Sequence, residues 1–283
     1  MNKEPQLCKS GDNMSNALLS FPDRTMEAAT ALSGGSWRTG FTLLSLQNAL
    51  LSKVARSTDA TAAFTQFVVA CAAPKDARVI ALLNHNITLA GTVRARGYSD
   101  VGLTALVYDT GTQFAWPQTF TADMVAAYPN NWIFPTAAIQ TARYWKIEIV
   151  DTTNSAGYVQ IGRCWLGPAF EPAIGIADGL TLGYVSGDVL TSSIGDVDWA
   201  NRGGQRRAAV MTFDTLDAAE KRTALVMQKT LGKSGEIMFV ADKTAIVEDM
   251  LLESFPAKIR NASAITYPYF GRNSLPLEVL EII

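Results

Sequence analysis

The side chains that could perform chemistry are few and scattered along the chain. His85 is the single histidine among 283 residues, so a Ser-His-Asp or Cys-His catalytic arrangement would have to include it. The chain contains no G-x-S-x-G motif, which would present a nucleophilic serine on a sharp turn after a strand. His85 instead lies in a polar turn between Asn84 and Asn86, directly after a buried apolar run. We therefore expect a structural role for His85 and predict that the protein is not an enzyme.

Two further patterns look like ligand sites but lack essential positions. Residues 230–234 read Thr-Leu-Gly-Lys-Ser, yet methionine occupies the position of the first glycine of a phosphate-binding loop. The segment also follows a predicted helix instead of preceding one, so Gly232 is better explained as a helix C-cap. Asp188, Asp196 and Asp198 lack the spacing and the distal glutamate of a calcium-binding loop. We expect no cofactor and no metal site from these patterns.

Two groups of side chains remain as candidates for binding. Trp116, Tyr128 and Trp132 lie in loop-like segments, where aromatic rings stack on sugars or anchor protein interfaces. Such rings can equally close the end of a sandwich. Arg206 and Arg207 are candidate assembly residues, either in an inter-subunit salt bridge or facing the lumen of a ring. The alternative for the two arginines is a pair of exposed strand ends, which contributes little to stability.

The composition excludes several classes of protein. Hydrophobic residues make up 48% of the chain and charged residues 18%, which fits a globular protein with a large core. The net charge of −2 shows no basic excess, so nucleic acid is not an expected partner. No apolar run reaches the length of a membrane span, and no signal peptide is visible. Three widely spaced cysteines indicate free thiols in a chain made in a reducing cytoplasm: Cys8, Cys71 and Cys164.

The elements that would position these residues are mostly strands. The clearest pattern runs over residues 143–168, where Trp145, Ile147 and Ile149 share one face because side chains alternate along a strand. A turn rich in Asp, Asn and Gly follows, and a return strand is predicted over 158–165. We expect this β-hairpin to close a sandwich, which favours binding or assembly over catalysis.

The pattern of residue types along the sequence divides the chain into three parts. Residues 1–36 are polar and predict an N-terminal arm. Residues 37–170 carry many short strands separated by turns, typical of a β-sandwich or jelly roll. Residues 171–283 predict a β-rich α+β domain with one main helix, which extends to about Lys233 and is capped at Asp214 or Thr215. The predicted fold class is therefore mainly β.

Two stretches in the first half resemble the galactose-binding-like, or discoidin-type, jelly roll. They are Ala77 to Ala95, a buried run followed by an alternating strand, and Arg143 to Pro168. The resemblance covers most of residues 41–170 and implies a β-sandwich. Such jelly rolls often hold a structural cation, although no residue of this chain is assigned to one.

The second half is similar to the ring-forming domain of tailed-bacteriophage distal tail and related tail-tip proteins. The similarity covers about residues 178–283. It consists of the arginine pair before a helix, the apolar strand Ile237–Val240, and an acidic-apolar closing strand over 277–281. No functional residue is transferred from that family.

Together the resemblances imply a virion structural protein of a phage tail tip or baseplate. Such a viral tail protein would form a homo-oligomeric ring at the distal end of the tail and link the tail tube to hub or fibre proteins. Its partners would be copies of itself and other baseplate proteins, and it would be made in the host cytoplasm. The alternative is a soluble carbohydrate-binding protein whose jelly roll recognises a host-surface glycan through Trp116, Tyr128 and Trp132.

Overall fold

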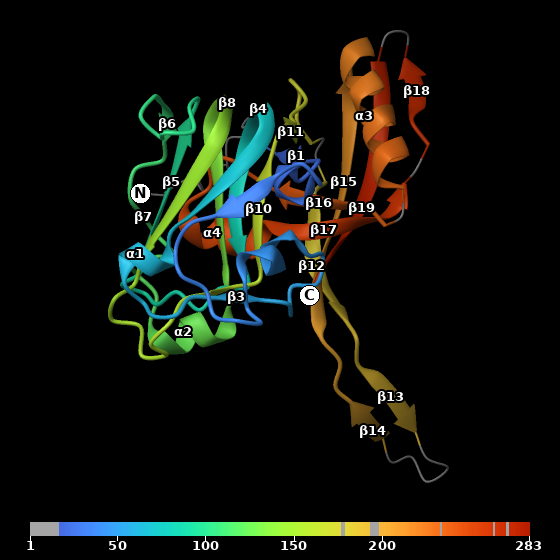
Figure 1. Cartoon of the computed structure of the whole chain (residues 1–283). Coiled ribbons are helices and arrows are strands. Elements are labelled where there is room, and N and C mark those ends of the chain that lie inside the picture. Colours follow the sequence, from blue (N-terminus) through green and yellow to red (C-terminus); the bar gives the residue numbers. More distant parts are fainter. Residues whose placement is uncertain (1–16, 177–178, 193–197, 233, 263, 270–271) are drawn as a thin grey trace, which may run out of the picture.

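The protein is described here by a computed structural model that covers residues 17–176, 179–192, 198–232, 234–262, 264–269 and 272–283 (Figure 1). It is mainly β, as predicted, with a sandwich on one side and a second sheet carrying one long helix on the other. The sandwich consists of β2 (Ala31–Ser33), β3 (Ala55–Arg56), β4 (Phe67–Leu83), β5 (Thr92–Tyr98), β6 (Leu106–Asp109), β7 (Gln113–Phe114), β8 (Asn131–Val150), β9 (Gln160–Ile161) and β10 (Arg163–Gly167), with short helices α1 (Ala62–Thr65) and α2 (Ala122–Ala127) and 3₁₀ turns at Arg24–Met26 and Leu43–Gln47.

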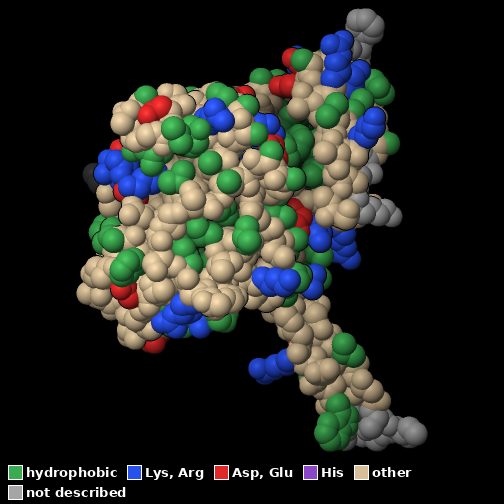
Figure 2. All heavy atoms as spheres, viewed as in Figure 1, with side chains coloured by type: hydrophobic (Ala, Val, Ile, Leu, Met, Phe, Trp, Pro, Cys, Tyr) green, Lys and Arg blue, Asp and Glu red, His purple; other side chains and the backbone are tan. Residues whose placement is uncertain are grey.

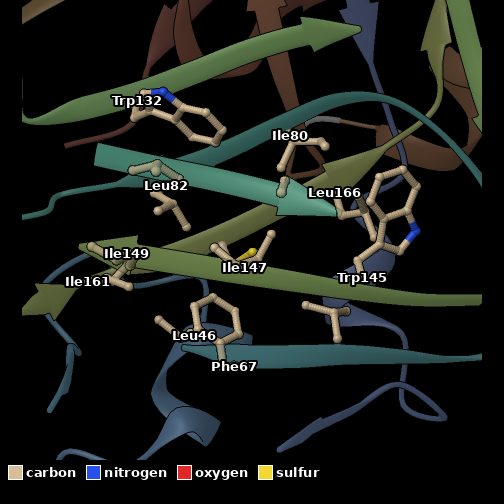
Figure 3. Close-up of a cluster of buried hydrophobic side chains, with 14 of the residues drawn as sticks. Leu46, Phe67, Ile80, Leu82, Trp132, Trp145, Ile147, Ile149, Ile161 and Leu166 are labelled. Atoms are coloured by element: carbon tan, nitrogen blue, oxygen red, sulfur yellow. The ribbon is translucent and has the colours of Figure 1, made fainter. Parts of the chain in front are cut away.

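Two long strands, β4 and β8, hold the sandwich together. Its main sheet has the order β10-β4-β8-β5-β6, with β2 beside β4 and β7 beside β5. The ladder between β4 and β8 shifts register between Ala70 and Lys75, so the first half of β4 pairs with β2 and its second half with β10. Trp145, Ile147 and Ile149 of β8 all point into the core, which confirms the predicted alternation (Figure 3).

The predicted hairpin over 143–168 does not form, although both of its strands exist. β10 pairs with β4, with Trp165 opposite Ala81, and β9 pairs with β3. The turn after β8 is anchored elsewhere, because the Asp151 carboxylate accepts hydrogen bonds from the backbone N–H of Thr88 and from the Asn154 side chain at 2.9 and 2.8 Å. The chain therefore crosses the end of the sandwich and pairs with other strands instead of returning along β8.

The second sheet begins with residues from the start of the chain. Its strands are β1 (Leu18–Ser20), β11 (Ala169–Phe170), β12 (Thr181–Ser186), β15 (Gln205–Leu216), β16 (Glu236–Val240), β17 (Phe255–Ala262), β18 (Thr266–Tyr269) and β19 (Arg272–Glu281). Their order is β11-β1-β16-β17-β19-β15-β12, with β18 beside β19. Because β1 is buried between β11 and β16, this part of the predicted N-terminal arm is an integral strand. Residues 1–16 lie outside the described residues.

The predicted helix is present as α3 (Ala218–Leu231) and begins later than expected. Asp217 caps it, and the Glu220 carboxylate accepts a hydrogen bond from the Asp217 N–H, so the two form a capping box. The residues before Asp217 continue β15 instead. Gly232 ends the helix with φ of 51°, as a C-cap glycine does. A second helix, α4 (Val247–Glu253), was not predicted.

Buried ion pairs and apolar contacts join the two halves. Arg163 of β10 pairs with Asp23 at 3.0 Å and also with Glu236 of β16. Glu171 pairs with Arg78 of β4 at 3.0 Å and with Lys243. An apolar cluster between the halves contains Leu18, Val79, Ala81, Leu83, Trp165, Met238 and Val240.

Candidate functional site

A two-stranded arm projects from the second sheet, away from the rest of the protein (Figure 1). β12 and β15 continue beyond the sheet as β13 (Val189–Ser192) and β14 (Asp198–Asn201). Every residue of β13 and β14 is exposed. We call residues 187–204 the arm, of which 193–197 are not described.

A narrow neck connects the arm to the sheet. Between the pairs Ser186–Gln205 and Val189–Asn201, two residues on one strand face three on the other, which is the arrangement of a β-bulge. The Gly187 N–H donates to the Gly204 carbonyl at 3.1 Å. A Cβ added at Gly203 would lie 2.1 Å from the Gly187 carbonyl oxygen. The neck therefore requires glycine, and the bulge sets the direction in which the arm leaves the sheet.

The arm carries apolar side chains on both faces. Because side chains alternate along a strand, Leu190 and Ala200 share one face, and Val189 and Trp199 share the other. Leu190 is 71% exposed and Trp199 67%. Figure 2 shows hydrophobic side chains on the arm, far from the main body. A two-stranded hairpin alone is at best marginally stable in water, so these side chains are suited to burial against a partner.

The two candidate arginines at the start of β15 have different surroundings. Arg207 is 3% exposed, pairs with Glu281, and donates to the carbonyls of Leu251 and Ser254 at 2.6 and 3.1 Å. Its bonds therefore tie α4 to the sheet within one chain, which leaves it unsuited to an inter-subunit salt bridge. Arg206 points to the opposite face and is exposed, and no carboxylate in the described part of the chain lies within ion-pair distance of it.

Arg206 lines a groove of about 370 Å³ at the root of the arm, which we call the root groove. Its walls come from β15, the start of β16, β17, the end of β19 and a turn of the sandwich. Figure 2 shows Lys and Arg side chains around the root of the arm on this face. The residues that define the groove here are Leu50, Arg206, Lys258, Arg260, Ile282 and Ile283.

A second hollow, of about 510 Å³, lies at the end of the sandwich, and we call it the loop-end pocket. Its walls combine polar and apolar groups from separate loops: His85, Asn86, Thr88, Trp116, Val125, Asn130 and Ser155, with their neighbours. Concave sites of this composition are common places for small ligands.

His85, in the wall of this pocket, is 1% exposed. Its Nδ1 accepts a hydrogen bond from the Ile87 N–H at 3.2 Å, and its ring meets the Trp116 ring edge-on. Nε2 has no well-aligned hydrogen-bond partner among the described residues. Burial lowers the pKa of His85 to about 3, against a small opposing effect of the Asn131 backbone. The imidazole is therefore neutral at physiological pH.

The three candidate aromatic residues pack against neighbouring side chains. Trp116 is 1% exposed and donates from Nε1 to the Ile87 carbonyl at 2.7 Å. Trp132 is 4% exposed and stacks on Phe134. Tyr128 is half-buried, with its ring close to that of Phe120. Both tryptophans belong to the hydrophobic core of the sandwich, and Trp116 also borders the loop-end pocket.

The described residues hold no cluster of three His, Cys, Asp or Glu side chains arranged to bind a metal ion. Asp188 accepts a hydrogen bond from the Gly203 N–H and Asp198 one from the Ser192 hydroxyl, whereas Asp196 lies outside the described residues. Among the helices that are described, none has the length and apolarity needed to cross a bilayer.

Comparison with known proteins gives limited similarities. No family model matches the chain, and no curated protein matches it. A family 32 carbohydrate-binding module from Clostridium perfringens (CpGH89CBM32-6) has a TM-score of 0.37 and 11% identity over 51% of this chain and 98% of its own. The family 32 module of NanJ from the same organism, solved with galactose, has a TM-score of 0.38 and 13% identity over 52% of this chain and 98% of its own.

A third solved structure is a Ruminococcus gnavus GH29 fucosidase in complex with fucose. It has a TM-score of 0.40 and 12% identity over 55% of this chain, and the matched region covers only 28% of the enzyme. All three similarities involve about half of this chain at very low identity.

Proposed function

We propose that this chain is a structural subunit that assembles with copies of itself through the arm. The observation that carries the proposal is the exposure of Leu190 and Trp199 on two projecting strands, β13 and β14, whose residues are all exposed. Apolar side chains on a thin, projecting ladder lose their contact with water only when another molecule covers them. Assembly therefore accounts for both the shape and the composition of the arm.

The specific assembly that we propose is the tail-tip ring implied by the sequence resemblance of residues 178–283. In this arrangement the second sheet and its arm make most of the contact with neighbouring subunits, and the sandwich contributes the turn at Leu50. The apolar cluster between the halves attaches the sandwich to this sheet. Other baseplate proteins would be its further partners, and the virion its final location. No catalytic role is proposed.

Light scattering during gel filtration tests the proposal on the full chain. The double variant Leu190→Ser/Trp199→Ser should shift the protein from an oligomer to a monomer, because it removes the two most exposed large apolar side chains in the described part of the arm. Val101→Ser is the matched control, since Val101 is also highly exposed but lies on a turn of the sandwich. Val101→Ser should leave the mass unchanged. An unchanged mass for the arm variant would reject assembly through the arm.

The loop-end pocket supports a second candidate function, the binding of a carbohydrate. The observation that favours it is the convergence of Asn86, Thr88, Asn130 and Ser155 around an apolar floor, since sugar recognition combines hydroxyl contacts with an apolar face. Galactose, the sugar in one of the solved structures, and its 2-acetamido derivative GalNAc are suitable first probes.

Calorimetric titration of the full chain with each sugar tests this candidate. Asn130→Ala and Ser155→Ala should weaken binding, because both exposed side chains line the pocket. Asn201→Ala on the arm is the control and should bind as the unmodified chain does. A lack of heat with either sugar would count against the carbohydrate candidate without affecting the assembly proposal.

A further inference from the structure

We propose that the root groove of one copy receives the arm of the next copy. This inference rests on the proposed assembly and adds the surface on which the arm docks. The groove lies beside the neck from which the arm of its own chain departs, because Arg206 of its wall follows directly after the last residues of the arm.

The arm of the same chain cannot fill this groove. β12 and β15 form one continuous ladder into the neck, and the tightly packed glycines there hold the arm pointing away from the body (Figure 1). Turning the arm back would break the Gly187–Gly204 hydrogen bond and the pairs on either side of it. An arm that fills this groove must therefore belong to another molecule, and a second copy of this chain carries such an arm.

The groove and the arm match in their apolar parts. Leu50 and Ile283 are exposed at the groove, and Ile282 is half-buried in its wall. Leu190 and Trp199 project from opposite faces of the arm. An arm lying in the groove could bury one face against these aliphatic side chains, while its other face contacts the body of the partner.

The two surfaces also have complementary charge. The arm carries Asp188 and Asp198, with Arg202 close to the neck. The groove is lined by Arg206, which has no described ion-pair partner, and by two other basic side chains. It is also lined by the carboxylates of Glu236 and Glu281, which already pair with Arg163 and Arg207 within the chain.

The two other basic side chains are only partly neutralised within the chain. Arg260 pairs with Glu278 at 3.0 Å, at an exposed position. Lys258 lies 3.8 Å from Glu236, whose other oxygen pairs with Arg163. A docked acidic arm would supply the missing counter-charge, and complementary charge of this kind fixes the register and choice of partner.

The proposed contact also explains how a ring could form. Arm and groove are different surfaces of the same chain, so each copy can donate to one neighbour and accept from another. Repetition of such a heterologous contact produces a ring when the rotation between copies closes.

A charge exchange tests the inference on full-length chains. The arm variant Asp188→Lys/Asp198→Lys and the groove variant Arg206→Glu/Arg260→Glu should each weaken self-association by about tenfold or more, because each places like charges opposite one another. A mixture of the two variants should recover association, because both contacts between unlike chains then pair opposite charges. The matched control, Arg222→Glu/Lys229→Glu on the exposed face of α3, should associate as the unmodified chain does.

Sedimentation velocity measures association, and thermal unfolding of each variant confirms that it is folded. Full association of the groove variant, or failure of the mixture to recover it, would overturn the groove as the docking surface. If Leu190→Ser/Trp199→Ser still abolished association in that case, the arm would remain the assembly element and only its receiving surface would be wrong. A monomeric unmodified chain would refute both proposals together.

Discussion

The neutral, buried state of His85 makes a quantitative prediction for stability against pH. In the unfolded chain the imidazole has its ordinary pKa of 6.5, whereas burial lowers its pKa to about 3 in the folded protein. Above pH 6.5 His85 is neutral in both the folded and the unfolded chain, so its titration takes nothing from the free energy of unfolding. Between pH 6.5 and about 3 only the unfolded chain binds it, so stability falls as the pH falls.

The size of the effect follows from the width of that window. Each pH unit below 6.5 costs about 1.4 kcal/mol, so His85 should remove about 2.7 kcal/mol from the free energy of unfolding between pH 8 and pH 4.5. The perturbation is His85→Gln, which removes the titrating group and keeps a polar side chain of similar length. The variant should lose about 2.7 kcal/mol less than the unmodified chain over the same interval.

Urea denaturation of both proteins at pH 8 and pH 4.5 provides the assay. Carboxylates such as Glu171 also titrate in this range, but they are present in both chains and cancel in the difference. If both proteins lost the same free energy, His85 would have to be protonated or accessible in the folded state. The buried and neutral state of His85 in the wall of the loop-end pocket would then be refuted.

Three further predictions concern packing and the arm. Arg207→Met should lower the free energy of unfolding by about 3–5 kcal/mol in urea denaturation, because Glu281 is left buried without its partner; the double variant with Glu281→Met should recover most of that loss. Trp145→Ala should cost about 3–5 kcal/mol by the same assay, through the cavity left in the sandwich core, and a loss below about 1 kcal/mol would contradict the burial of Trp145. Gly203→Val should change the oligomeric mass measured by light scattering, because its side chain meets the Gly187 carbonyl at the neck, whereas the melting temperature should change little; a native mass would show that the neck tolerates a side chain.

Local sequence patterns predicted where the strands lie better than they predicted which strands pair with one another. The alternation at Trp145, Ile147 and Ile149 is a local property, and it identified the core face of β8. The partner of the strand that follows depends on a distant anchor, the bond from Thr88 to Asp151, which no local pattern reveals. The predicted hairpin was therefore wrong in its pairing although its strands exist.

The candidate residues show the same limit. Arg206 and Arg207 were treated as a pair, yet alternation along a strand places neighbours on opposite faces. Ala209, Met211 and Phe213 occupy alternate positions after Arg207 and form an apolar face. The sequence therefore did contain a signal that Arg207 faces inward. Trp132 was expected in a loop but lies on β8 opposite Leu82, and Trp116 is buried by the loops around it, so the burial of both depends on tertiary contacts.

The arm was visible in the sequence only as strands. The sequence predicted a β-rich second half over residues 171–283, and β12 and β13 lie within it. Nothing local distinguishes the apolar side chains of the arm from those of a core strand. The glycines at 187, 203 and 204 are the one signal of the neck, since glycines at both ends of a hairpin permit close backbone contact.

Self-assembly through the arm is the central claim, and removing the arm tests it most directly. Residues 187–204 can be replaced by Asn-Gly, which would join Ser186 to Gln205 through a tight two-residue turn. Sedimentation velocity should find the unmodified chain as a multi-copy species and the armless chain as a monomer with the same unfolding transition. Identical sedimentation of the two chains over a wide range of concentrations would contradict the claim.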